Sequence, residues 1–139
     1  MKAKVNWLHD FRMEGQTESA NIVHMDSVPK GEKSAGASPS ELILQALAGC
    51  TMMDIVIMVR KEKKKIDKFW IDVDADIAED YPKVFTKIHL TYNLISPDLD
   101  DATLARAIKL SEDKYCRVHA MLGKNVNITS SYNIERPIT

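Results

Sequence analysis

The sequence lacks an excess of charge of either sign, because 19 Lys and Arg residues oppose 20 Asp and Glu residues and leave a formal net charge of −1. This balance offers no broad basic field for nucleic acid, so we expect no nucleic-acid partner. The chain also lacks a positively flanked apolar leader before a small-residue cleavage site, which predicts a cytoplasmic location. Its 139 residues, 45% of them apolar, predict one globular domain over residues 1–139.

Cysteine is scarce, and only Cys50 and Cys116 occur. The cytoplasm keeps thiols reduced, so a pair there is more often catalytic, redox-active or simply buried than a structural cross-link. His119 could join both cysteines around zinc, but no fourth ligand is evident. The alternating aspartates of residues 72–76 lack the glycine and the closing glutamate of a calcium loop. We therefore predict no metal site.

What the sequence does contain is one long segment, residues 38–65, which predicts a helix with an apolar middle and a basic end. Ser38 suits the N-cap position, and Pro39 suits the first helical position, where a missing N–H has no cost. Glu41 lies three residues after the cap and completes a capping box. The start of this helix is therefore well marked by the sequence.

From residue 42 to residue 59, apolar side chains are distributed around the whole helix and do not form a single stripe. Other protein must therefore cover nearly all of its surface. The length raises the question of a membrane span, but Gln45 and Asp54 lie inside the segment and argue against insertion. We predict a buried central helix and no membrane partner.

Alternation of apolar and polar residues predicts strands on both sides of the helix. The predicted segments are strands over residues 2–8, 19–25, 69–78, 84–94 and 125–134, a turn at 11–15, a polar connection over 26–37, a helix over 100–114 that ends near Cys116, and a helical turn over 118–122. The third and fourth strands should pair side by side with one solvated face. This order of elements, ββ, helix, ββ, helix, β, indicates an α+β fold.

Two motifs contain the cysteines: SPSELILQALAGCTMMDIV around Cys50 and LSEDKYCRVHAML around Cys116, 66 residues further on. Together with the order of elements, they resemble the OsmC/Ohr superfamily of osmotically induced and organic-hydroperoxide-resistance proteins over residues 7–134. The resemblance implies an intertwined homodimer in which antiparallel sheets surround two long buried central helices. Such a dimer would also explain why the central helix is apolar on all sides.

The resemblance further implies a thiol peroxidase that reduces organic hydroperoxides. Cys50 would be the peroxidatic nucleophile that becomes a sulfenic acid, and Cys116 the resolving thiol that forms a disulfide with it. An external dithiol, such as a lipoylated protein, would restore both thiols, so no bound cofactor is expected. The family uses an arginine from the N-terminal strands to stabilise the thiolate, and Arg12 is the candidate here.

One position departs from the family pattern. The family's orienting glutamate directly follows the helix-opening proline, where this chain has Ser40. At about 100° per residue, Glu41 lies roughly 180° around the helix from Cys50, whereas Asp54 lies only about 40° away and one turn on. A carboxylate so close opposes a thiolate unless a cation neutralises it. We therefore predict that Asp54 holds Arg12 over Cys50, or that it marks a different chemistry.

Other interpretations stay open at this point. A cysteine among apolar neighbours is often a small core residue, and Cys116 could be an inert residue at a helix end. Arg12 could be an ordinary surface charge at a strand end. The same fold could also serve as a non-catalytic binding protein for a small lipid-like molecule in the dimer cleft, or as a thiol redox sensor.

Overall fold

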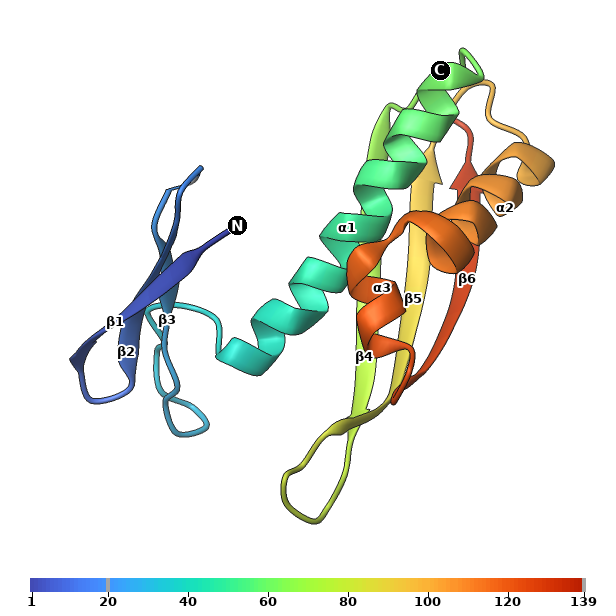
Figure 1. The fold of residues 1–139 in the computed structure, drawn as a ribbon. Helices are drawn as coiled ribbons and strands as arrows, with labels where there is room; N and C mark the ends of the chain where they lie inside the picture. Colours follow the sequence, from blue (N-terminus) through green and yellow to red (C-terminus); the bar gives the residue numbers. More distant parts are fainter. Residues whose placement is uncertain (20, 139) are drawn as a thin grey trace. The chain divides into compact units, whose positions relative to one another are not determined.

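The computed structural model describes residues 1–19 and 21–138. The chain divides into two compact units, Met1–Leu44 and Gln45–Thr139. Helix α1, Pro39–Lys61, begins in the first unit and continues through the second (Figure 1).

The first unit contains a three-stranded antiparallel sheet in the order β1-β2-β3. Its strands are β1 Ala3–His9, β2 Arg12–Thr17 and β3 Val23–Met25. The expected turn at residues 11–15 is therefore wrong, because the chain reverses at Asp10 and Phe11, with Asp10 at a positive φ of 47°. The expected strand over residues 19–25 shortens to β3, and Ala20 within it lies outside the described residues.

The polar connection over residues 26–37 folds back along β3. Asp26 donates its N–H to the Ala37 carbonyl at 3.2 Å, and its carboxylate accepts the Ala35 N–H at 3.0 Å. Gly36 approaches the His24 carbonyl so closely that a Cβ atom at this position would clash with it. The connection is thus an ordered loop tied to its own sheet.

Helix α1 begins as the sequence predicts. Glu41 donates its N–H to Ser38 Oγ at 3.3 Å, and Ser38 donates its N–H to Glu41 Oε2 at 2.9 Å. The predicted end at residue 65 is four residues too far, because Lys63 adopts a positive φ of 58°. Lys63 and Lys64 then donate to the carbonyls of Arg60 and Val59, which closes the helix end.

Only one stripe of α1 is buried within the chain. Its fully buried members follow a four-residue spacing: Leu47, Thr51, Ile55 and Val59. Met53 remains 68% exposed and Ile57 51% exposed, so the single chain leaves apolar surface on the helix uncovered. Among the described residues, α1 is the one helix long and apolar enough to cross a membrane, but a single core helix passes the same test and is weak evidence for a span.

The second unit contains a three-stranded sheet in the order β4-β5-β6, formed by β4 Lys68–Ile77, β5 Phe85–Ile95 and β6 Asn127–Glu135. Strands β4 and β5 pair in antiparallel fashion, as predicted. Strand β6 runs parallel to β5, so the expectation of purely antiparallel sheets is wrong for this pair. The reason is the connection, since intervening helices carry the chain back to the start of β5 before β6 begins.

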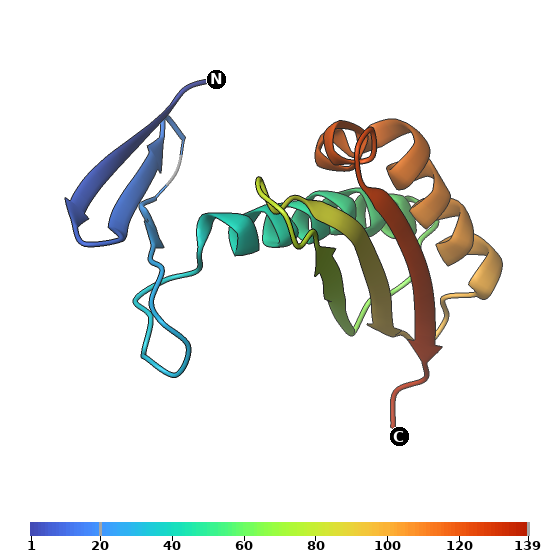
Figure 2. The same ribbon diagram turned by 90° about the horizontal axis from the view of Figure 1, so that it is seen from below.

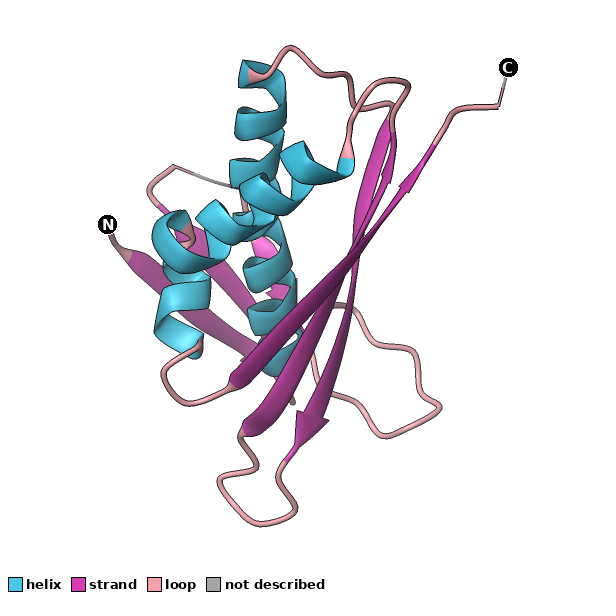
Figure 3. Cartoon of the chain, turned by 90° about the vertical axis from the view of Figure 1, so that its right-hand side faces the viewer, coloured by secondary structure: helices cyan, strands magenta, loops and turns pink. Residues whose placement is uncertain are grey.

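The helices of the second unit cover one face of this sheet (Figures 2 and 3). They comprise the later part of α1, then α2 Asp101–Leu110, a single π-helical turn η1 Ser111–Tyr115, and α3 Arg117–Leu122. The buried side of β5 packs under them through Ile88, Leu90, Tyr92 and Leu94. On β4, the aspartates of residues 72–76 are exposed, which confirms the predicted solvated face.

Candidate thiol site

Cys50 lies in the middle of α1, one residue before the buried stripe member Thr51, and is itself half-buried. A position so deep inside a helix places the thiol away from the helix terminus, where the dipole could stabilise a thiolate. Any stabilisation of charge on this sulfur must therefore come from neighbouring side chains.

Cys116 lies between η1 and α3 and is only 2% exposed. Its N–H donates to the Ser111 carbonyl at 2.8 Å, which is the five-residue step of a π turn. Its Sγ atom accepts the N–H of His119 at 3.3 Å and so caps α3. The backbone thus fixes this sulfur on both sides.

The structure places the two thiols close together. The Cys50 side chain is near enough to influence the Cys116 thiol, and both cysteines are free. Burial, and then the neighbouring Cys50 side chain, raise the pKa of Cys116 to about 12. At neutral pH Cys116 therefore keeps its proton.

Asp54 lies one helical turn after Cys50 and is held by a residue that sequence reasoning missed. Its Oδ2 atom accepts a hydrogen bond from Ser111 Oγ at 2.9 Å. Ser111 is fully buried and opens the π turn that leads to Cys116. The carboxylate near the first cysteine is thereby linked to the backbone segment of the second.

A second buried hydrogen bond adjoins the thiols. Tyr92 is fully buried on β5 and donates its hydroxyl to Glu112 Oε1 at 2.9 Å. Thr51 and Cys116 also lie near enough to influence the Tyr92 hydroxyl. Burial, with the charge of Glu112 beside it, raises the pKa of Tyr92 well above its usual range.

An open pocket with a volume of about 370 Å³ begins beside Asp54. Its walls are the apolar side chains of Ile57, Met58, Leu110 and Tyr115, with Asp54 and Lys61 as charged members. The lining residues that belong to α1 lie on the same side of the helix as Cys50, at steps of three and four residues. A small amphipathic molecule would suit this lining.

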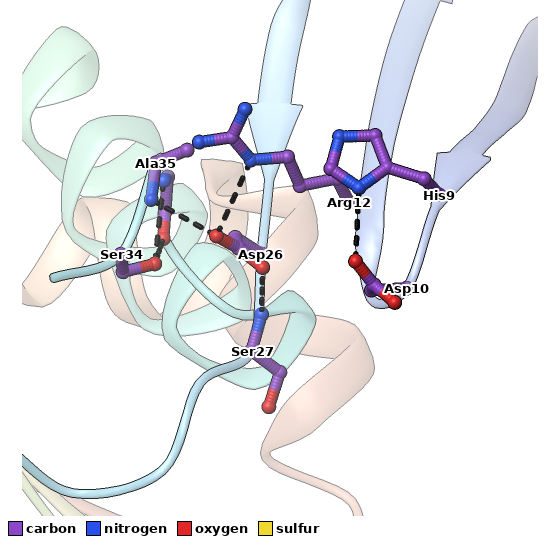
Figure 4. Close-up of polar contacts among 8 residues, drawn as sticks. His9, Asp10, Arg12, Asp26, Ser27, Ser34 and Ala35 are labelled. Atoms are coloured by element: carbon purple, nitrogen blue, oxygen red, sulfur yellow. Dashed lines mark hydrogen bonds and ion pairs between the residues drawn. The ribbon is translucent and has the colours of Figure 1, made fainter. Parts of the chain in front are cut away.

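Arg12 lies in the first unit and has a carboxylate partner there. Its Nε atom is 3.7 Å from Oδ2 of the buried Asp26, as Figure 4 shows. The backbone hydrogen bond from Ala35, followed by the Ser27 bond and the nearby guanidinium, lowers the pKa of Asp26. The predicted role of Arg12 over Cys50, held by Asp54, stays a prediction.

His119, considered above as a zinc ligand, lies beside Cys116, and its Nε2 atom is enclosed without a hydrogen-bond partner within residues 1–19 and 21–138. In the same described part of the chain, no group of three or more His, Cys, Asp and Glu side chains is arranged to hold a metal ion. Glu41 pairs with Ser38 at the helix start and therefore acts as a cap.

Sequence reasoning missed Ser111, Glu112 and Tyr92. Tyr92 had a usable signal, since a tyrosine on the apolar face of an alternating strand must bury its hydroxyl and needs a partner. The partner on a distant helix, and the bond between Ser111 and Asp54, depend on the tertiary fold and left no local pattern.

Comparison with known proteins gives one consistent result. A model of the OsmC-like protein family matches residues 30–131. The chain is 36% identical to Protein YhfA of Escherichia coli over 134 residues, which are 96% of this chain and 98% of the relative. It also has the fold of the OsmC-like protein from Mycoplasma pneumoniae, at 18% identity and a TM-score of 0.81 over 96% of this chain and 95% of that one. The organic hydroperoxide resistance protein OhrB of Bacillus subtilis is similar at 17% identity and a TM-score of 0.66, over 96% and 98% of the two chains.

Proposed function

This chain belongs to the OsmC-like protein family, and from that premise we propose that it is a thiol peroxidase that reduces organic hydroperoxides. The observation that carries the proposal is the proximity of half-buried Cys50 to buried Cys116. Similarity of fold to proteins named for organic hydroperoxide resistance supports the same chemistry.

The reaction begins at Cys50, because burial keeps its partner protonated. The Cys50 thiolate attacks the terminal oxygen of the hydroperoxide, the O–O bond breaks, and the alcohol leaves after taking a proton. Cys50 is then a sulfenic acid. The Cys116 sulfur attacks the Cys50 sulfur, an S–S bond forms, the S–O bond breaks, and the thiol proton leaves with the hydroxyl group as water.

An external dithiol completes the cycle by thiol–disulfide exchange, and its own two thiols become a disulfide. A lipoylated protein is one reductant of this class. On the basis of the family resemblance, we assign Arg12 as the cation that would stabilise the Cys50 thiolate. A cytoplasmic location fits a site that needs both thiols reduced between turnovers.

The experiment follows consumption of cumene hydroperoxide with dihydrolipoamide as reductant. Cys50→Ser should abolish enzymatic consumption, whereas Cys116→Ser should still react once and accumulate a sulfenic acid that dimedone traps. If wild type and Cys50→Ser consume the hydroperoxide at the same rate between pH 6 and 9 with several dithiols, the chain is not a peroxidase.

We also propose a homodimer, supported by the apolar surface that α1 leaves open at Met53 and Ile57. An obligate interface of this kind typically buries over about 2,000 Å². Sedimentation should therefore give a dimer at micromolar concentration, and a stable folded monomer would contradict this assembly.

A second candidate function is non-catalytic binding of a small lipid-like molecule. The observation that favours it is the pocket of about 370 Å³ along α1, which combines an apolar lining with Lys61 and Asp54. Native mass spectrometry of the purified protein tests this candidate. A stoichiometric co-purified ligand that Lys61→Ala removes would support binding as the function if the peroxidase experiment fails.

A further inference from the structure

Cys50, Asp54, Ser111 and Cys116 are joined in a closed path of neighbouring groups. Asp54 stands one helical turn from Cys50 on α1 and accepts the hydrogen bond of Ser111 Oγ at 2.9 Å. The Ser111 carbonyl accepts the N–H of Cys116 at 2.8 Å, and the Cys116 thiol lies near the Cys50 side chain. The path therefore returns to the helix on which it began.

Ser111 is the fixed point of this path. It is fully buried, and its own N–H bonds the carbonyls of Ala107 and Ile108 at the end of α2. The chain next makes the π turn η1, which adds one residue to the helical repeat and redirects Cys116. The hydroxyl, the N–H and the carbonyl of Ser111 thus all make hydrogen bonds, which either anchor this turn or hold Cys116.

We propose that Asp54 and Ser111 are positioning residues that set the Cys116 sulfur against Cys50 for disulfide formation. This inference rests on the proposed function, in which Cys116 attacks the sulfenic acid at Cys50 and releases water. A disulfide requires Cα atoms about 4.4–6.8 Å apart and a narrow range of torsion angles. Displacement of an attacking atom by about 1 Å can slow such a step by about 100-fold.

The role differs from the one that the sequence suggested for Asp54. A carboxylate that held only Arg12 would act on the first step, because it would influence the thiolate of Cys50. A carboxylate that holds Ser111 acts on the second step, because it fixes the segment that carries Cys116. The two roles therefore differ in the rate that they control.

The main test is a single turnover of reduced protein with limiting cumene hydroperoxide. Ser111→Ala removes the hydroxyl and should slow hydroperoxide consumption far less than it slows disulfide formation. Disulfide formation should slow by at least about tenfold, which is the loss expected for a hydrogen bond to a charged group, and dimedone should trap more sulfenic acid. Equal slowing of both steps, or no slowing of the second, would overturn the proposal.

Thr103→Ala is the matched control. Thr103 is also a buried hydroxyl residue of this helical segment, and it donates to a carboxylate, Asp100 Oδ1, at 2.7 Å. Its hydrogen bond does not lead to Cys116. If Thr103→Ala slows disulfide formation as much as Ser111→Ala does, the effect is general destabilisation and the positioning role is refuted.

A second measurement does not depend on peroxidase activity. Equilibration with reduced and oxidised glutathione gives the effective concentration of the Cys50–Cys116 pair. Ser111→Ala should lower it by at least about tenfold, and Asp54→Asn, which keeps a neutral acceptor, by less. An unchanged effective concentration in both variants would overturn the proposal. If the effective concentration falls but the protein does not consume hydroperoxide, the positioning role stands and only the peroxidase function is refuted.

Discussion

Removal of the Tyr92 hydroxyl tests the buried hydrogen bond that lies beside the thiol pair. Tyr92→Phe keeps the ring, which is fully buried on β5, and deletes the donor to Glu112 Oε1 at 2.9 Å. Thr51 loses a neighbour but retains the carbonyls of Leu47 and Ala48 as acceptors at 3.3 and 3.0 Å. The substitution therefore removes one hydrogen bond and leaves the packing intact.

The size of the effect follows from the charge and burial of the partners. A hydrogen bond to a charged group contributes about 1.5–3 kcal/mol to the free energy of unfolding. Glu112 is half-buried and can regain water when its donor is lost, so the lower part of this range applies. We expect the free energy of unfolding to fall by about 1.5–2 kcal/mol and Tm by roughly 5 °C in a chain of this size.

Urea unfolding followed by circular dichroism measures this change, with Tyr132→Phe as the matched control. Tyr132 on β6 also has a carboxylate nearby, that of Asp101, but it is more exposed than Tyr92. The loss of its hydroxyl should lower the free energy of unfolding by clearly less than the loss of the Tyr92 hydroxyl, because water can replace the contact at a more exposed position. Equal costs for the two variants, or no cost for Tyr92→Phe, would refute the reasoning.

Two further predictions concern stability elsewhere in the chain. Ser38→Ala removes the cap that accepts the Glu41 N–H at 3.3 Å, and urea unfolding should show a loss of about 1 kcal/mol; no loss would mean that Glu41 alone stabilises the start of α1. Burial raises the pKa of Cys116 from 9.0 to about 12, so the unfolded thiol loses its proton before the folded one does. The free energy of unfolding should therefore be unaffected by Cys116 below pH 9 and fall between pH 9 and 12, by at most about 1.4 kcal/mol per pH unit. Under a phosphine reductant, Cys116→Ala should flatten this decline, and an equally steep decline in the variant would contradict the assigned pKa.

Local sequence signals predicted the fold where they were strong. The capping residues Ser38 and Glu41 located the start of α1, and clean alternation located β4 and β5. These local signals failed where tertiary contacts determine the secondary structure. Strand β2, RMEGQT, has almost no apolar alternation and forms because it pairs between β1 and β3. The π turn at Ser111 interrupts a helical pattern that looks continuous in sequence.

The candidate site was predictable only in part, and for a physical reason. Two cysteines 66 residues apart carry no local sign that they meet, so their pairing was expected from the family resemblance. The polar bonds that surround them, from Ser111 to Asp54 and from Tyr92 to Glu112, join elements distant in sequence. A periodic pattern marks which face of an element is buried, but it does not identify the residue opposite.

The central claim is that Cys50 and Cys116 act as a peroxidatic and resolving pair within one chain. The most direct measurement adds one equivalent of cumene hydroperoxide to the fully reduced protein and determines the mass and the cross-link map. The proposal predicts the loss of two hydrogen atoms within one chain and a Cys50–Cys116 disulfide, with no such product in Cys50→Ser. Accumulation of sulfonic acid at Cys50 with Cys116 untouched, or no change in mass, would contradict it.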